Sequence, residues 1–73
     1  METSDFNKAA FLLARDFPIK DTTRQGRRMT FHFSDTKEIN DAVREFNSGQ
    51  STIQTNAFIS AQNHLRSVIY DTP

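Results

Sequence analysis

The sequence contains no cysteine and no tryptophan, and only two glycines and two prolines among its 73 residues. Without cysteine the chain can form no disulfide, and it lacks the cysteine and histidine spacing of a structural zinc site. No apolar run approaches the roughly 20 residues that a membrane-spanning helix needs. The first residues, METSDFNK, hold acids rather than the apolar core of a secretory signal. We therefore expect a soluble cytoplasmic protein that neither enters nor spans a membrane.

The chain is short of hydrophobic material, and phenylalanine supplies much of what it has. Only 36% of the residues are hydrophobic, and seven of them are phenylalanine. A chain of this size buries only about 60–65% of the surface that its unfolded form exposes. Each buried ring removes roughly 150–250 Å² from water, so a few rings can build a small core. We expect one domain over residues 1–73, stabilised by packing alone.

The charges cancel overall but are unevenly placed. Nine basic residues balance nine acidic ones. Residues 15–28 hold five basic and two acidic residues, a net charge of +3, and the remainder carries −3. We expect a basic hairpin end opposite an acidic helix.

The first apolar pattern predicts a helix from Asp5 to Arg15, with Thr3 or Ser4 as the N-cap. Phe11 and Leu12 lie off its main apolar stripe, so this helix is apolar nearly all round. Either it is covered on two sides within the monomer, or it exposes an apolar patch. The stripe itself consists of Phe6, Ala9, Ala10, Leu13 and Phe17.

Two alternating runs around Gly26 predict a β-hairpin. A three-residue loop, Arg24–Gly26, would pair Ile19 with Phe31 and place glycine where a left-handed residue is wanted. A two-residue loop at Gln25 and Gly26 would put the apolar residues of the two strands on opposite faces. We therefore favour the three-residue loop. The alternating apolar residues are Phe17, Ile19, Met29, Phe31 and Phe33.

Two further helices are expected in the second half. The first begins at Ser34 or Asp35, where Asp35 and Glu38 resemble a capping box, and ends at Gly49. Residues 51–54 favour a short strand. Thr55 then caps a helix over 56–70. The apolar stripes of the two helices are Ile39, Ala42, Val43 and Phe46, and then Phe58, Ala61, Leu65, Val68 and Ile69.

The element order is therefore α-β-β-α-(β)-α, an α+β fold in which helices cover one face of a small antiparallel hairpin sheet. The segments AAFLLARDFPI, GRRMTFHF and REFNSGQSTIQTNAFISAQNHLRSVIY resemble a family of very small uncharacterised proteins of bacteria and phages. The resemblance covers roughly residues 5–70. One departure is Asp16, where the family pattern usually shows glycine at a left-handed helix end. The resemblance implies a shared fold, and it implies no activity.

Apolar residues outside the main stripes predict a protein-interaction surface. We expect a non-enzymatic module that binds another protein or a second copy of itself. A chain this short has little material with which to cover a helix on every side. The expected interface residues are Phe11, Leu12, Ile59 and Tyr70.

The alternative is a nucleic-acid-binding module that uses the basic hairpin 20–28. Arginine and lysine bind phosphates, and a histidine ring can stack on a base. The neutral net charge counts against this alternative, because nucleic-acid-binding domains are usually basic. The residues concerned are Lys20, Arg24, Arg27, Arg28 and His32.

Neither a metal site, a cofactor site nor catalysis is expected. His32 and His64 lie far apart in the sequence, with no second ligand at helical spacing. No set of residues combines a nucleophile, a base and oxyanion donors. Acid-base catalysis by paired carboxylates needs a cleft, whereas the carboxylates of the second helix are expected to face water. They are Asp35, Glu38, Asp41 and Glu45.

Overall fold

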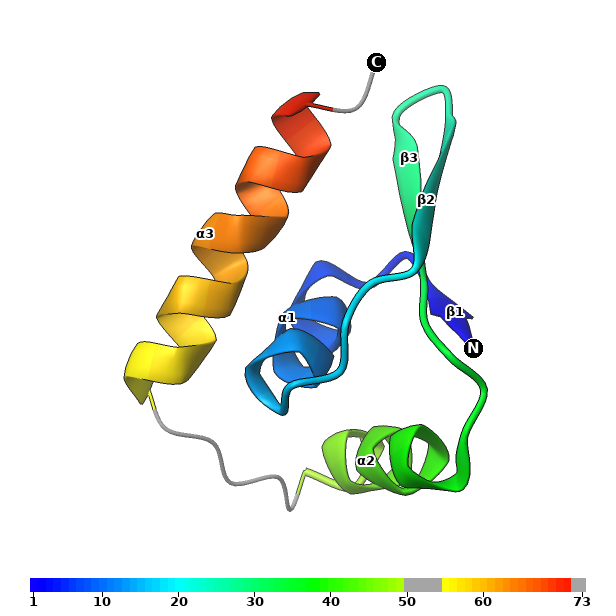
Figure 1. The fold of residues 1–73 in the computed structure, drawn as a ribbon, viewed down its shortest axis with the longest axis vertical. Helices are drawn as coiled ribbons and strands as arrows, with labels where there is room; N and C mark the ends of the chain where they lie inside the picture. Colours follow the sequence, from blue (N-terminus) through cyan, green and yellow to red (C-terminus); the bar gives the residue numbers. More distant parts are fainter. Residues whose placement is uncertain (50–54, 72–73) are drawn as a thin grey trace.

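The computed structural model describes residues 1–49 and 55–71. Over these residues it contains three helices and one three-stranded antiparallel sheet with strand order β1-β3-β2, which confirms the α+β class (Figure 1). The elements are β1 (Glu2–Thr3), α1 (Phe6–Ala14), β2 (Asp21–Gln25), β3 (Arg28–His32), α2 (Lys37–Asn47) and α3 (Thr55–Asp71).

Helix α1 lies at the centre of the molecule. It packs against α3 on one side, α2 on another and β1 at its start (Figure 1). Phe11 and Leu12 are therefore 1% and 0% exposed, and the ring of Phe11 lies 5.3 Å from that of Phe46 on α2. The expectation that these two residues form a surface is wrong. The helix is apolar all round because other elements surround it.

The N-cap of α1 is Asp5, which follows Thr3 and Ser4, the two caps expected. Its carboxylate accepts hydrogen bonds from the backbone N–H groups of Asn7 and Lys8, at 3.0 and 3.2 Å. The hydroxyl of Thr3 accepts from the N–H of Asp5 instead. An aspartate cap adds a negative charge at the positive end of the helix dipole, which favours it over serine or threonine.

The end of α1 is a left-handed turn at Asp16, which has φ of +69°. The N–H of Phe17 donates to the carbonyl of Leu12 at 3.0 Å, and the N–H of Asp16 donates to that of Leu13 at 2.9 Å. These two bonds form a Schellman motif, which usually has glycine at the left-handed position. The left-handed helix end that the family pattern implies is therefore present, although this chain has aspartate there.

Replacing Asp16 with glycine is expected to stabilise the fold by about 0.5–1 kcal/mol. A side chain at positive φ strains the backbone, and removing it outweighs the extra freedom of glycine in the unfolded chain. Asp16→Ala is the control and should destabilise, because alanine lacks the tolerance of aspartate for this conformation. Urea titration of both variants measures the difference. A glycine variant less stable than the wild type would contradict the prediction.

The hairpin register differs from the one expected. Strand β2 begins only at Asp21, so Phe17 and Ile19 belong to the connection from α1 and reach the core from there. Thr22 lies opposite Phe31, Arg24 lies opposite Met29, and the loop consists of Gly26 and Arg27. The expected pairing assumed that apolar residues of one strand face those of the other, whereas helices cover Met29 and Phe31.

Two features of the expected hairpin are confirmed. Gly26 has φ of +61°, as a tight hairpin turn requires. Met29, Phe31 and Phe33 are buried, whereas the side chains of β3 between them remain accessible. The prediction of which β3 side chains face inward was therefore correct, and only the alignment of the partner strand was wrong.

Helix α2 begins later than expected. Its N-cap is Thr36, whose hydroxyl accepts from the N–H of Ile39 at 3.3 Å. The expected capping box of Asp35 and Glu38 does not form, because with Thr36 as cap Glu38 stands one residue too early. The expected end is confirmed, since Gly49 follows the helix with φ of +75°.

The remaining strand is β1, which the sequence pattern did not predict. It is two residues long and pairs with β3, Glu2 opposite His32 and Thr3 opposite Phe31. The expected strand at 51–54 lies outside the described residues. Helix α3 begins at Thr55, close to the expected start, and buries Ala61 and Leu65 against the core.

Candidate functional site

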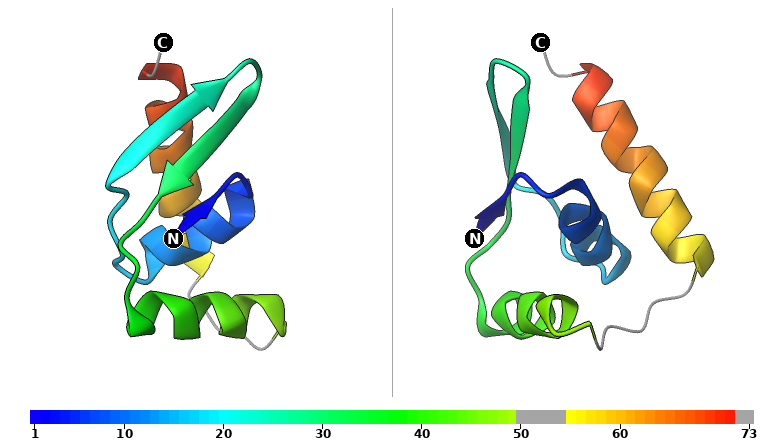
Figure 2. Two further views of the ribbon diagram at one scale, coloured as in Figure 1. Left: turned by 90° about the vertical axis from the view of Figure 1, so that its right-hand side faces the viewer. Right: turned by 180° about the vertical axis from the view of Figure 1, so that it is seen from behind.

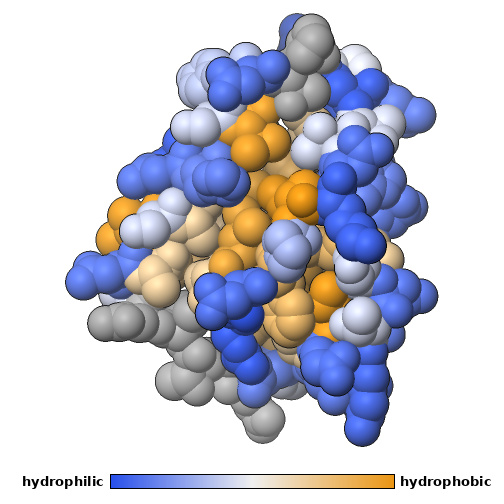
Figure 3. Space-filling model, viewed as in Figure 1, coloured by the Kyte–Doolittle hydropathy of each residue, from blue (hydrophilic) through white to orange (hydrophobic). Residues whose placement is uncertain are grey.

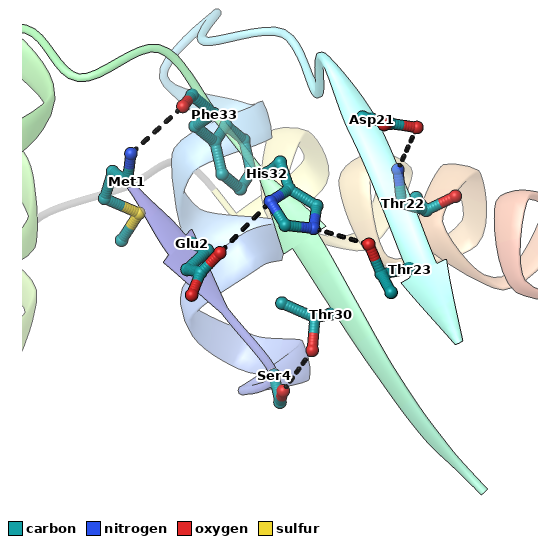
Figure 4. A network of polar contacts seen from close by, with 9 residues as sticks. All are labelled: Met1, Glu2, Ser4, Asp21, Thr22, Thr23, Thr30, His32 and Phe33. Carbon is teal, nitrogen blue, oxygen red and sulfur yellow. Dashed lines mark hydrogen bonds and ion pairs between the residues drawn. The ribbon is translucent and has the colours of Figure 1, made fainter. Parts of the chain in front are cut away.

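The outer face of the sheet is polar and open to solvent, with α3 on the far side of the hairpin (Figure 2, left). His32 links all three strands on this face. Its Nδ1 lies 3.2 Å from the carboxylate of Glu2, and its Nε2 lies 2.8 Å from the hydroxyl of Thr23 (Figure 4). The hydroxyls of Ser4 and Thr30 are joined beside them at 3.0 Å.

The order carboxylate, imidazole and hydroxyl is that of a nucleophilic triad, so catalysis must be weighed here. The hollow around these groups measures about 190 Å³ and is open, and the side chain of Glu2 is 68% exposed. Water therefore solvates the groups that a catalytic triad keeps dry. Among the side chains that line the hollow, apart from the hydroxyls and the imidazole, only the amide of Gln25 could donate a hydrogen bond to an oxyanion. We interpret the network as a cross-strand link.

The basic residues of the hairpin do not gather on one surface. Arg24 donates a hydrogen bond to the carbonyl of Ile69, at the last turn of α3, at 2.9 Å. Lys20 lies in a separate hollow at the base of the hairpin, and His32 is held by Glu2 on the outer face. Arg15, near in sequence, forms an ion pair with Glu45 at 2.6 Å. A phosphate backbone would meet these charges on different sides.

Arg27 and Arg28 instead lie beside an apolar groove of about 470 Å³. This hairpin groove is bounded by the hairpin, the start of α1 and the end of α3, three elements that can be followed in the view from behind (Figure 2, right). Its floor combines buried and half-buried apolar side chains, and both arginines are exposed. The lining consists of Ser4, Phe6, Arg27, Arg28, Met29, Phe31 and Ile69.

The opposite face is also partly apolar. Figure 3 shows apolar surface along the middle of that face, bordered by hydrophilic residues on both sides. The connection from α1 to β2 crosses this face, where Leu13, Ile19 and Val68 line a hollow of about 370 Å³. Charged and polar neighbours, Lys20, Asp21 and His64, interrupt this hollow. The hairpin groove is the larger of the two.

The four residues expected to form an interface are not brought together. Ile59 and Tyr70 are 48% and 87% exposed and point in nearly the same direction from α3. At 1.5 Å per residue they are about 17 Å apart along the helix. Asn63 and Arg66 stand between them, joined by a hydrogen bond of 2.9 Å. With Phe11 buried, no continuous apolar patch results.

Sequence reasoning identified Arg27 and Arg28 as candidates but missed the apolar floor of the groove. Phe6 and Ile69 lie on helix stripes, which indicate burial and not a site. They stay half-buried because an open groove separates the hairpin from the end of α3. No pattern in the sequence indicates that these two elements leave a groove between them.

Two of the acidic residues at and before α2 have structural partners. Asp35 accepts from the side chain of Asn40, and Asp41 lies 3.7 Å from Arg44. Over residues 1–49 and 55–71, no group of three or more histidine or acidic side chains is placed to hold a metal ion. None of the helices in these ranges is long and apolar enough to cross a membrane.

Comparison with known proteins gives one match. The model of the domain of unknown function DUF5659 matches residues 1–71, and the chain belongs to that family. No curated protein and no solved structure matches the chain.

Proposed function

We propose that this DUF5659 protein is a non-enzymatic protein-interaction module and that it binds its partner through the hairpin groove. The observation that carries the proposal is the combination in one place of an open apolar floor and two exposed arginines. Neither Arg27 nor Arg28 forms an ion pair with any described residue. Two other polar side chains of the hairpin, those of Arg24 and His32, already have partners within the chain.

Both parts of the groove suit protein binding. Displacing water from apolar surface stabilises a complex by roughly 25 cal/mol per Å². Arginine is enriched in protein interfaces, because its side chain combines an apolar stem with a planar charged group. A partner covering about 800 Å² would take roughly one sixth of the 4967 Å² surface of this chain. The groove provides the centre of such an interface.

Two isoleucines on α3 allow a matched test. Ile69 lines the groove, whereas Ile59 lies on the outer side of the same helix. Peptides selected by display on the immobilised wild-type chain should lose at least tenfold in affinity for Ile69→Glu, because a carboxylate would stand on the apolar floor. They should bind Ile59→Glu as well as the wild type. Amide NMR spectra of both variants establish that each is folded.

Mapping of NMR chemical-shift changes provides a second measurement, which needs no variant. Adding a selected peptide to the wild-type chain should shift the amide signals of residues 4–6, 27–31 and 66–69. Shifts confined to the outer side of α3, with loss of binding in Ile59→Glu alone, would place the interface at Ile59 and Tyr70 and contradict the groove. Sedimentation of the unliganded chain tests whether the partner is a second copy.

Nucleic-acid binding through the hairpin is the alternative that the geometry favours less. It would require Lys20, Arg24 and Arg28 to contact one phosphate backbone, and they lie in different surroundings. Retention of a mixed DNA and RNA pool at low salt, lost when these residues are neutralised, would favour this alternative. A cytoplasmic location in a bacterial or phage-infected host, as the cysteine-free sequence and the family resemblance imply, completes the proposal.

A further inference from the structure

The charged residues that line the hairpin groove are all of one sign. Its lining contains Arg27 and Arg28 and no acidic residue. Arg66 adds a third guanidinium nearby, since it lies 5.7 Å from the centre of the Phe6 ring. Asp5, the closest acid in sequence to the groove wall, is engaged as the N-cap of α1. A ligand in the groove therefore meets arginine side chains and no carboxylate of the lining.

Arg24 makes these surroundings more favourable to an anion. The end of α3 carries the partial negative charge of its unpaired carbonyl groups, which would repel a carboxylate. Arg24 donates to one of these carbonyls, that of Ile69, at 2.9 Å. The helix end beside the groove is thereby compensated within the chain. The other two hairpin arginines stay available to a ligand.

We propose that the hairpin groove receives an acidic segment of another protein that carries one bulky apolar side chain. This inference rests on the proposed function and names the class of partner. The apolar side chain enters between Phe6, Met29 and Ile69, where about 470 Å³ is open. Carboxylates flanking it lie against Arg27 and Arg28 at the rim.

A second copy of this chain matches that description less well. The acidic residues of α2 lie on a helix whose apolar side, Ile39 and Ala42, is buried, so α2 offers no apolar side chain to the groove of another copy. Tyr70 and Asp71 combine a ring with a carboxylate, but they stand at the end of α3, beside the groove itself. Two copies exchanging these residues would bring two arginine-bearing hairpin tips close together, and like charges repel. A different protein avoids this conflict.

Fluorescent peptides of equal length test the inference directly. Each carries a central phenylalanine, flanked by aspartates, by serines or by lysines, and binding is followed by anisotropy. The aspartate peptide should bind best, and its affinity should fall as salt rises, because exposed ion pairs are screened. Reversing both rim charges, in Arg27→Glu with Arg28→Glu, should weaken it roughly tenfold or more.

Lys37→Glu is the matched control. It makes the same change of charge at an exposed position in the first turn of α2, distant from the hairpin (Figure 1). Its affinity for the aspartate peptide should change less than twofold. An equal loss in Lys37→Glu and in the rim variants would show a response to net charge alone and would overturn the inference.

The peptide series separates this inference from the proposed function. If the serine or lysine peptide binds best, and Ile69→Glu abolishes that binding, the groove is an interaction site but its partner is not acidic. If no peptide binds and the chain stays monomeric in sedimentation, both proposals fail. If Tyr70→Ser abolishes self-association of the chain, the occupant is a second copy and the acidic partner is overturned.

Discussion

Phe11→Ala is expected to lower the free energy of unfolding by about 3–5 kcal/mol. Phe11 is 1% exposed and lies at the centre of the molecule. Its ring centre is 5.3 Å from that of Phe46 and 5.4 Å from the guanidinium of Arg15. Alanine would leave a cavity. Because other elements enclose α1 on several sides, the surroundings cannot relax enough to fill it. The total free energy of unfolding of a domain of 73 residues is roughly 4–11 kcal/mol. Urea titration followed by circular dichroism should show a chain near or past its limit of stability.

Ile59→Ala is the control for that result. Ile59 is 48% exposed on the outer side of α3, so its truncation should change stability by no more than about 0.5 kcal/mol. If Phe11→Ala cost as little as Ile59→Ala, the central position of α1 would be wrong. The two variants also separate the residues that the sequence grouped together as an interface.

Gly26→Val is expected to destabilise the fold by about 1–2 kcal/mol. Gly26 has φ of +61° at the first position of the two-residue hairpin turn, a conformation that a branched side chain adopts only under strain. Apart from its chain neighbours, no atom of the described residues lies within 4 Å of the position that an added Cβ would occupy. The expected cost is therefore assigned to backbone strain and not to a clash of the Cβ. Thermal or urea unfolding measures it.

Gly26→Asn separates strain from any other effect of a side chain. Asparagine tolerates a left-handed conformation better than valine, so its cost should be clearly smaller. Equal losses in the two variants would contradict the assignment to strain. Both variants should also loosen the hairpin groove, because Arg27 and Arg28 follow this turn directly.

Local patterns in the sequence account for much of the fold. The apolar spacing located three helices to within a few residues, and alternation predicted that Met29 and Phe31 of β3, and Phe33 directly after it, face inward. Gly26 and Gly49 marked a turn and a helix end, both at positive φ. These features depend on neighbours along the chain, which is why the sequence alone reveals them.

Errors arose where two local signals competed. Asp5 and Thr36 cap the first two helices, while neighbouring serine, threonine and aspartate residues offered equally good caps. The hairpin register was misassigned because it was chosen to pair the apolar residues of the two strands with each other. The structure instead has helices covering β3, and Phe17 and Ile19 approach the core from a connection.

Only the tertiary structure decided what is surface. Phe11 and Ile59 both lie off the main stripes of their helices, yet α1 is enclosed by other elements while α3 lies at the periphery (Figure 1). Likewise, Arg24 is held by the end of α3, whereas Arg27 and Arg28 line the groove. Exposure and pairing depend on elements distant in the sequence, and the packing of those elements sets them. The sequence determined which residues carry charge and apolar area, and the packing determined which of them a partner can reach.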